Sequence, residues 1–380
     1  MHSNPVTAAV LNPPPRRWRI AHSEFSLGWG GQEHRVLAEL AGFQKRGGEV
    51  WLIAPSQSEI FRRAKIESIP AIPLRADKLR FPFEIIRLAR WLRRNQIQIL
   101  NTHSSRDGWL LGIAGRLARV PLIIRTRHID VTYPHRWLSR HAYTTLADQL
   151  LTTSRKISAH FQEMFGLPAD RISTVPTGID LELFSPSGAK AKLADEPSAL
   201  LPIIGMISVL RSWKGHATFL EAAAQMKAAG FAGRFVIVGE GPMRPSIEQQ
   251  IARLNLGDRV TLTGHREDVP ELLRALDVLV MPSTHHEGIP QIGLQALATQ
   301  TPVVGSDAGG IPEIIRDGET GRIFPAGDAP ALAAAIRKTL HETEATNKMT
   351  GAGRKLVEAG HSLNKMLDDL DSIYRRHLPA

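Results

Sequence analysis

Residues 278–313 read VLVMPSTHHEGIPQIGLQALATQTPVVGSDAGGIPE. Two short apolar runs in this stretch predict buried strands, and the residues between them predict a helix at 291–299. Glu287 stands in the loop before that helix, and Glu313 stands in the loop after the second strand. In open α/β sheets, ligands bind at the carboxyl ends of strands, where helix N-termini attract anions. The stretch therefore predicts a parallel α/β sheet whose edge carries two acids at an anion-binding crevice.

The alternation of strand and helix runs through the whole chain and restarts once, near residue 201. An apolar strand at 18–22 leads into the glycine-rich loop at Gly30 and Gly31, and a second such series begins with a strand at 202–210. This pattern is typical of two doubly wound parallel sheets. We predict an extended or disordered N-terminus at 1–17, Rossmann-like domains at 18–185 and 201–360, a linker at 186–200 and a last helix at 361–380.

The composition excludes several classes of protein. The chain has 380 residues, 43% of them hydrophobic, and contains no cysteine, which rules out disulfides, a thiol nucleophile and a cysteine-based zinc site. No stretch approaches the roughly 18–20 apolar residues of a membrane span. Arg16 and Arg17 follow the short apolar run at 6–11, which is the reverse of a signal peptide. We therefore expect a cytoplasmic protein.

The net charge of +10 lies entirely in the first half of the chain. Residues 1–185 hold 26 Lys and Arg against 15 Asp and Glu, and residues 186–380 hold 21 against 22. Such a field attracts anionic partners. A predicted helix at 83–95 has two interpretations: it docks on an anionic membrane, or it packs on the sheet with solvated charges. The residues concerned are Arg75, Lys78, Arg80, Arg87, Arg90, Arg93, Arg94, Phe81, Phe83 and Trp91, with Ile85, Ile86, Leu88, Ala89 and Leu92 as the apolar face.

Further polar residues follow predicted strands. Arg211 and Lys214 stand in the turn after the strand at 202–210, where cations can neutralise a diphosphate. His103 and His128 each follow a strand end and point toward one crevice. The alternative interpretation of Arg211 and Lys214 is a solvated turn. The alternative interpretation of the two histidines is a structural role in hydrogen bonds. The Gly241 and Gly264 turns lie at neighbouring strand ends and have room for a flat base.

Several motifs taken together resemble the retaining family-four, or group 1, glycosyltransferases. They are the run from Gly205 to Gly215, the Gly239–Pro242 turn, Ser283 to Pro290, Gly309 to Gly321, Gly30-Gly31, His128, and Pro176 to Phe184. The resemblance extends from about residue 18 to 375. It implies the GT-B architecture, in which two Rossmann-like domains face each other across a cleft, with the donor on the second domain and the acceptor on the first. The last helix is then expected to return to the first domain.

The resemblance also implies roles for individual residues. Arg211 and Lys214 would hold the diphosphate, Glu287 would lie near the sugar hydroxyls, and His128 would contact the sugar or the acceptor. Donor binding would further involve Gly30, Gly31, Gly241, Gly264, His265, Gly288, Ile289, Pro290, Gln291, Ile292, Gln295 and Glu313. His103 and Arg127 would lie on the acceptor side. No cofactor and no metal ion are expected, and the substrate would be a UDP- or GDP-linked sugar.

Two positions depart from the family's pattern. Gln295 replaces the second acid of the family's E-x7-E pair, and its amide is still able to hydrogen-bond a ribose diol. Val209 stands where the family commonly has an arginine, so Arg211 would reach the phosphate from a shifted position.

The leading hypothesis is a retaining glycosyltransferase that transfers a sugar from a nucleotide-sugar donor to a saccharide or lipid-linked acceptor. The products would be cell-surface polysaccharide, lipopolysaccharide or glycolipid. A nucleotide-sugar epimerase with the same fold and a catalytically silent nucleotide-sugar-binding protein are the alternatives. Contact with the inner face of the plasma membrane is compatible with the basic first domain. Nucleic acid is not expected as a partner, because no aromatic and basic reading surface is present.

Overall fold

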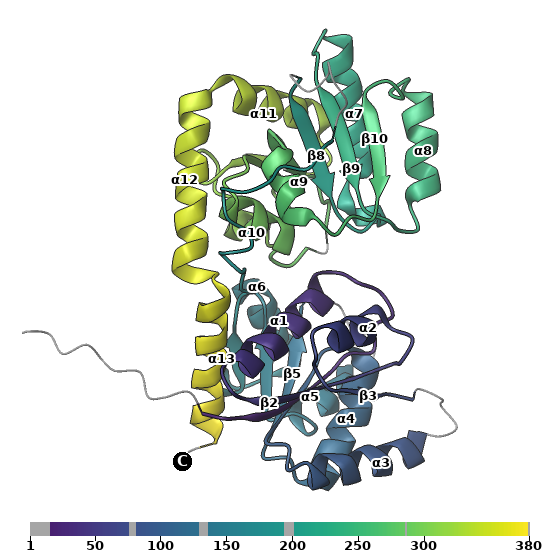
Figure 1. Cartoon of the computed structure of the whole chain (residues 1–380), viewed down its shortest axis with the longest axis vertical. Helices are drawn as coiled ribbons and strands as arrows, with labels where there is room; N and C mark the ends of the chain where they lie inside the picture. Colours follow the sequence, from purple (N-terminus) through teal and green to yellow (C-terminus); the bar gives the residue numbers. More distant parts are fainter. Residues whose placement is uncertain (1–15, 76–80, 129–135, 194–200, 286, 379–380) are drawn as a thin grey trace, which may run out of the picture.

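The structure is a computed structural model that describes residues 16–75, 81–128, 136–193, 201–285 and 287–378. It contains two parallel sheets, each covered by helices, in two domains (Figure 1). The first sheet has the strand order β3-β2-β1-β4-β5-β6-β7, and the second has the order β10-β9-β8-β11-β12-β13. In both sheets the order reverses beside the first strand of the domain. Such a reversal opens a crevice at the carboxyl ends of the strands.

The elements of the first domain alternate along the chain. Its strands are β1 (Arg19–Ser23), β2 (Glu49–Ala54), β3 (Ala71–Pro73), β4 (Ile99–Thr102), β5 (Leu122–Arg127), β6 (Gln149–Thr152) and β7 (Ile172–Thr174). Its helices are α1 (Gly31–Lys45), α2 (Glu59–Ile66), α3 (Phe81–Arg94), α4 (Ser105–Ala118), α5 (Arg136–Thr144) and α6 (Arg155–Phe165). Buried Val, Ile and Leu side chains fill the space between sheet and helices.

The second domain repeats the alternation. Its strands are β8 (Ile203–Ile207), β9 (Arg234–Val238), β10 (Val260–Gly264), β11 (Val278–Met281), β12 (Val303–Ser306) and β13 (Arg322–Phe324). Its helices are α7 (His216–Ala228), α8 (Arg244–Arg253), α9 (Val269–Ala275), α10 (Gln291–Ala298), α11 (Ala329–His341) and α12 (Thr343–Gly360), and the chain closes with α13 (Leu363–His377). The predicted two-sheet α/β architecture is confirmed.

Ile86 of α3 is more exposed than the sequence predicts. The prediction that Ile86 belongs to the apolar face of this helix is wrong, because the residue is 44% exposed. The buried residues of α3 are Glu84, Leu88, Ala89 and Leu92, a narrower stripe, and Ile86 lies outside it. The predicted extended N-terminus at 1–17 lies almost wholly outside the described residues, as do Lys78, Arg80 and part of the linker at 186–200.

The two C-terminal helices connect the domains. α12 runs along the second domain, and α13 continues along the first (Figure 1). On α13, Leu367, Leu370 and Tyr374 belong to the same buried cluster as Trp18 and other residues of the first domain. The indole Nε1 of Trp18 donates to Asp371 Oδ1 at 2.6 Å. The last helix therefore completes the core of the first domain, as expected for a helix that returns to it.

No helix in the described part of the chain is both long and apolar enough to cross a bilayer.

A glycine sets how closely α13 approaches α1. A Cβ placed on Gly42 of α1 would lie 2.4 Å from Leu367 Cδ1. We expect Gly42→Val to lower the free energy of unfolding by about 1–3 kcal/mol, because the added methyl groups overpack this contact. Thermal and urea denaturation measure the change. Gly351→Val in α12 is the control, because the space around Gly351 is open. An unchanged midpoint for Gly42→Val would contradict the close packing of α13 on α1.

Candidate active site

A partly buried ion pair lies at the carboxyl ends of β8 and β11, which are neighbouring strands of the second sheet. Lys214 ends a short 3-10 turn after β8, and its Nζ donates to Glu287 Oε1 in the loop after β11. The side chains are 21% and 8% exposed. Because the carboxylate is nearly buried, removing Lys214 would leave an uncompensated charge. The structure therefore joins the predicted cation and the predicted acid in one unit.

Close backbone packing holds the turn that carries Lys214. Gly215 has φ +76°, and a Cβ there would lie 1.8 Å from the carbonyl oxygen of Pro282. Only glycine fits this position, because both the backbone conformation and the space exclude a side chain. The next residue, His216, is buried and has its Nε2 3.5 Å from Ser208 Oγ. Burial and, to a smaller extent, the nearby Lys214 lower the pKa of His216 to about 4, so the ring is neutral at pH 7.

Two contacts bring the two domains together around this pair. A Cβ on Gly288 would lie 2.7 Å from the main-chain oxygen of His128. A Cβ on Gly31 would lie 3.3 Å from Gln291 Oε1, so the start of α1 faces the start of α10. The glycine-rich loop at Gly30 and Gly31 and the start of α10 therefore face each other across the interdomain space. Glycines at these points allow the backbones to approach closely.

Val209, which stands where the family commonly has an arginine, lies between the two domains. A Cβ on Gly30 would lie 4.0 Å from Val209 Cγ2. Val209 therefore faces the glycine-rich loop of the first domain. Arg211 is exposed, and its Cζ lies 5.6 Å from the centre of the Trp213 ring. A guanidinium held over an aromatic ring at this distance gains cation–π stabilisation. Whether Arg211 reaches a diphosphate stays a prediction.

The two predicted histidines meet in the first domain. His103 follows β4, His128 follows β5, and His103 Nδ1 lies 2.9 Å from His128 Nε2. The His103 side chain is 1% exposed, so it supports the ring of His128 and is too deeply buried to contact an acceptor itself. Arg127, the other residue predicted for the acceptor side, ends β5 and is 7% exposed.

The turns predicted to hold the donor base lie next to each other. Gly239 N donates to the main-chain oxygen of Gly264 at 2.8 Å, and Leu210 N donates to that of Glu240 at 2.9 Å. The strand ends at β8, β9 and β10 are thus joined by backbone hydrogen bonds. His265 is exposed beyond them, with its Nε2 4.0 Å from Glu267 Oε1. Gln295 lies on α10 and is partly buried.

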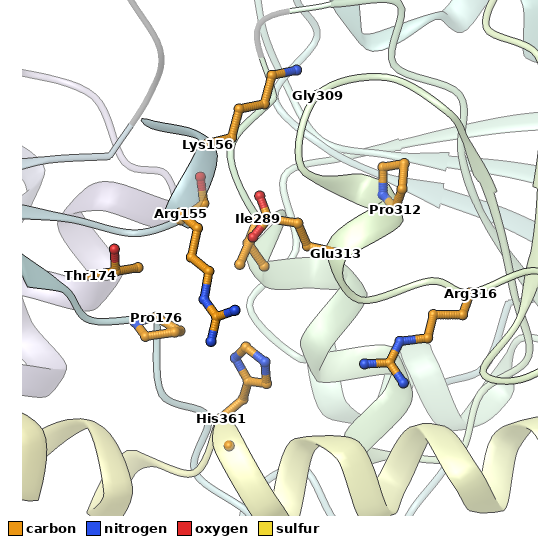
Figure 2. Close-up of a pocket in the computed structure, with 12 residues that line it drawn as sticks. Arg155, Lys156, Thr174, Pro176, Ile289, Gly309, Pro312, Glu313, Arg316 and His361 are labelled. Atoms are coloured by element: carbon orange, nitrogen blue, oxygen red, sulfur yellow. The ribbon is translucent and has the colours of Figure 1, made fainter. Parts of the chain in front are cut away.

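Glu313 lies on the other side of the loop that carries Gly309. It lines a pocket of about 780 Å³ between the domains, together with Arg155, Lys156, Arg316 and His361. Figure 2 shows the Arg155 side chain directed toward the His361 ring, with Glu313 facing the segment that carries Arg155. Burial raises the pKa of Glu313, and the Ser154 hydroxyl and nearby Lys156 oppose that shift. The structure thus places Glu313 against α6, and its predicted role in donor binding stays a prediction.

Sequence reasoning missed a pair of buried acids in the first domain. Glu24 follows β1 and accepts from Ser26 N at 2.8 Å, while Asp107 in the first turn of α4 accepts from Ser23 Oγ at 2.6 Å. Burial and, to a smaller extent, the neighbouring Asp107 carboxyl group raise the pKa of Glu24 to about 8. Neither residue belongs to a motif that the sequence singles out, and they are far apart in the chain, so no pattern along the chain indicates their proximity.

One group in the described residues has the composition of a metal site. Nitrogens of His22 and His103 and an oxygen of Glu39 lie within 4.8 Å of one another. However, His103 Nε2 is already 3.1 Å from His22 Nδ1, and Arg35 Nε donates to Glu39 Oε1 at 2.6 Å. A guanidinium bonded to the same carboxylate disfavours a divalent cation through charge repulsion. The expectation that the protein needs no metal stays an expectation.

Comparison with known proteins now identifies the family. A family described as "Glycosyl transferases group 1" matches residues 201–342, and one described as "Glycosyltransferase Family 4" matches residues 29–183. The chain belongs to these glycosyltransferases. The two matched regions contain the second sheet, the ion pair and all strands of the first sheet except β1, so the family assignment rests on both domains.

Three relatives illustrate the similarity. The chain is 28% identical over 357 residues to alpha-D-kanosaminyltransferase of Streptomyces kanamyceticus, covering 84% of this chain and 92% of the relative. It is 28% identical over 305 residues to UDP-Gal:alpha-D-GlcNAc-diphosphoundecaprenol alpha-1,3-galactosyltransferase of Escherichia coli, covering 76% and 78%. The crystal structure of Anabaena HepE with UDP-glucose matches with a TM-score of 0.80 and 19% identity, covering 93% and 98%. The fold is therefore GT-B, and the protein is a glycosyltransferase.

The buried acid Glu24 makes stability depend on pH. Its pKa is about 8 in the folded state against an ordinary value of 4.5, so the folded state binds more protons between these values and stability falls as pH rises from 4.5 to 8. Glu24→Gln removes this loss. We expect the variant to gain stability over the parent by about 1 kcal/mol or more on going from pH 5 to pH 8.5.

Urea unfolding at the two pH values measures the difference. Glu163→Gln, on the exposed face of α6, is the matched control and is expected to show the parent's pH dependence. An equal effect of Glu24→Gln at both pH values would contradict a protonated Glu24.

Proposed function

We propose that this protein is a retaining, metal-independent glycosyltransferase that uses a UDP-linked sugar and acts on a saccharide or lipid-linked acceptor. The sugar C1–O bond to the diphosphate breaks and the nucleoside diphosphate leaves, while a bond from C1 to an acceptor hydroxyl oxygen forms and the hydroxyl proton passes to the leaving diphosphate. The observation that carries the proposal is the Lys214–Glu287 pair, nearly buried where the two domains meet.

The pair has the charges that the transfer requires. As the C1–O bond breaks, negative charge grows on the leaving diphosphate, and a fixed ammonium stabilises that charge more than it stabilises the ground state. Lys214 has three N–H donors and uses one for Glu287, which leaves donors for phosphate oxygens. Glu287 fixes the position of the ammonium and is itself able to accept from sugar hydroxyls.

The donor assignment is supported by two relatives. HepE has been crystallised with UDP-glucose, and the E. coli relative is named for its UDP-Gal donor. In this chain, a Cβ on Gly241 would lie 2.6 Å from the main-chain oxygen of Leu210, which precedes the turn that carries Lys214, and Gly264 accepts a backbone hydrogen bond from Gly239. A UDP-sugar is therefore the donor we propose.

The acceptor is proposed to be membrane-borne. The E. coli relative is named for a diphosphoundecaprenol-linked acceptor. On α3, Phe83 is 75% exposed and Ile86 is 44% exposed, and Arg90 and Arg94 on the same helix are exposed as well. Arg87 differs, because Glu84 binds its guanidinium. Exposed apolar side chains beside basic ones favour an anionic membrane surface. We place the protein in the cytoplasm, at the inner face of the plasma membrane, in surface polysaccharide, lipopolysaccharide or glycolipid synthesis.

We expect Lys214→Met and Glu287→Gln each to lower kcat by about 100-fold or more, because each removes charge stabilisation of the leaving group or its positioning. Transfer from UDP-sugars to lipid-linked saccharide is measured by chromatography of the product. Lys227→Met, which removes an exposed ion pair with Asp258, is the matched control and is expected to keep full activity. Full activity of both site variants would refute the site. Conversion of the donor sugar without acceptor, followed by NMR, would indicate an epimerase, and tight donor binding without any turnover would indicate a silent binding protein.

We expect Arg90→Ala combined with Arg94→Ala to weaken binding to vesicles that contain anionic phospholipid by roughly thirtyfold, at about 1 kcal/mol per basic residue near the surface. Vesicle sedimentation measures the binding. Lys348→Ala combined with Lys355→Ala, on the exposed face of α12, removes the same charge from the second domain and is expected to have little effect. Equal effects of the two double variants would contradict docking through α3.

A further inference from the structure

Three histidine rings form one buried row at the carboxyl ends of adjacent strands. His22 is in β1, His103 follows β4, and His128 follows β5. His128 Nε2 lies 2.9 Å from His103 Nδ1, and His103 Nε2 lies 3.1 Å from His22 Nδ1. The row begins beside Gly288 in the candidate active site and ends in the interior of the first domain, next to Glu39 of α1.

All three rings are neutral at pH 7. Burial lowers the pKa of His22 to about 4, with Arg35 adding to the shift and Glu39 opposing it. Burial and nearby positive charge also hold the pKa values of His103 and His128 well below the usual range. Each ring therefore carries one N–H and one acceptor nitrogen.

The hydrogen bonds along a row of neutral rings have only two consistent directions of donation. If His22 donates from Nδ1, His103 accepts at Nε2 and donates from Nδ1, and His128 accepts at Nε2 and carries its own proton on Nδ1. In the opposite direction, His128 donates from Nε2, His103 donates from Nε2, and His22 carries its proton on Nε2. Because His103 is shared by both hydrogen bonds, its tautomer couples the other two.

Glu39 selects between these directions. Its Oε2 lies 3.8 Å from His22 Nδ1 and has no hydrogen-bond partner in the described part of the chain. A proton on Nδ1 is attracted to this carboxylate, whereas a lone pair there is repelled by it. In the opposite direction the N–H would be on His22 Nε2, which is buried without a partner. A buried N–H without an acceptor costs free energy comparable to a lost hydrogen bond.

Arg35 fixes Glu39 in place. Its Nε donates to Glu39 Oε1 at 2.6 Å, and its Nη1 donates to the main-chain oxygen of Val175 at 2.8 Å. Both side chains of the pair are at most 1% exposed. The charged end of the row is therefore rigid and shielded from solvent, where an electrostatic preference is strong.

We propose that Glu39, acting through His22 and His103, holds His128 in the tautomer with its proton on Nδ1. Nδ1 is the ring nitrogen nearer the backbone, and the backbone of His128 contacts Gly288, next to Glu287. The row thus presents a neutral N–H donor to an oxygen of the bound sugar or acceptor. The role in transfer rests on the function proposed above, but the tautomer does not. His22, His103 and Glu39 are positioning residues in this scheme.

The tautomers are read directly by long-range ¹H–¹⁵N correlation spectra of protein labelled at histidine. We expect Nδ1–H forms for all three rings, assigned with single His→Asn variants. Glu39→Gln is expected to shift His128 to the Nε2–H form or to a mixture of forms. An Nε2–H form of His128 in the parent protein, or no change in Glu39→Gln, would overturn the proposal. A stoichiometric metal in the purified protein, with His22 in the Nε2–H form, would also overturn it in favour of a metal site.

A second variant covers the case in which Glu39→Gln leaves Arg35 unpaired and does not fold. His22→Phe keeps an aromatic ring in the core, removes the first donor of the row, and is expected to shift His128 in the same way. With transfer as the readout, we expect His22→Phe to lower kcat about tenfold or more with little change in the donor KM.

We expect the double variant His22→Phe with His128→Ala to lower kcat no more than His128→Ala alone, because both substitutions act through the His128 ring. Additive losses would overturn the positioning role. His341→Asn, an exposed histidine of α11, is the control in both measurements. A protein that transfers no sugar but shows the expected tautomers would refute the proposed function and leave the row intact.

Discussion

The reversal of strand order in each sheet is the constraint on which the site depends. In the second sheet, β8 pairs with both β9 and β11, so the turn after β8 and the loop after β11 open at the same place. Lys214 and Glu287 are 73 residues apart in the chain, and this topology is what brings them into contact. The first sheet repeats the arrangement at β1 and β4, where His22 and His103 meet. The same reversal of strand order therefore places the polar residues of each domain on the side that faces the interdomain space.

The two walls differ in their electrostatics. The second domain presents a paired cation and acid that are partly accessible, which suits a charged donor. The first domain buries its polar groups more deeply: burial raises the pKa of the Glu24 carboxyl to about 8, and it lowers the pKa values of His22, His103 and His128. A wall of neutral donors and acceptors is suited to hydroxyl groups, because it orients them without imposing charge. This division agrees with a donor on one domain and an uncharged nucleophile on the other.

The sequence predicts the regular parts of this structure well. The strand predicted at 18–22 is β1 (Arg19–Ser23), and the helix predicted at 291–299 is α10 (Gln291–Ala298), because a short apolar run and a proline before the first turn define them locally. The meeting of Lys214 with Glu287 was implied by the strand-end turns and by the family resemblance. The sequence does not indicate that Arg35 and Glu39 are buried, since an i, i+4 ion pair on a helix usually faces solvent. In this protein, the packing of α13 and β7 buries the pair. The prediction for Ile86 is wrong for the opposite reason. Apolar neighbours on α3 suggest that Ile86 is buried, but the buried residues of this helix lie on another face.

The return of α13 to the first domain has a consequence for how the protein is made. Trp18, near the start of the described chain, packs edge-on against Tyr374 at 6.0 Å between ring centres. The first domain leaves the ribosome early, yet part of its core arrives only with the last helix. Domains that are synthesised first commonly fold first. Until the last helix has been translated, the apolar residues of α1 that pack against Leu367 and Tyr374 lack these partners, so the first domain completes its core only after the second domain has been made.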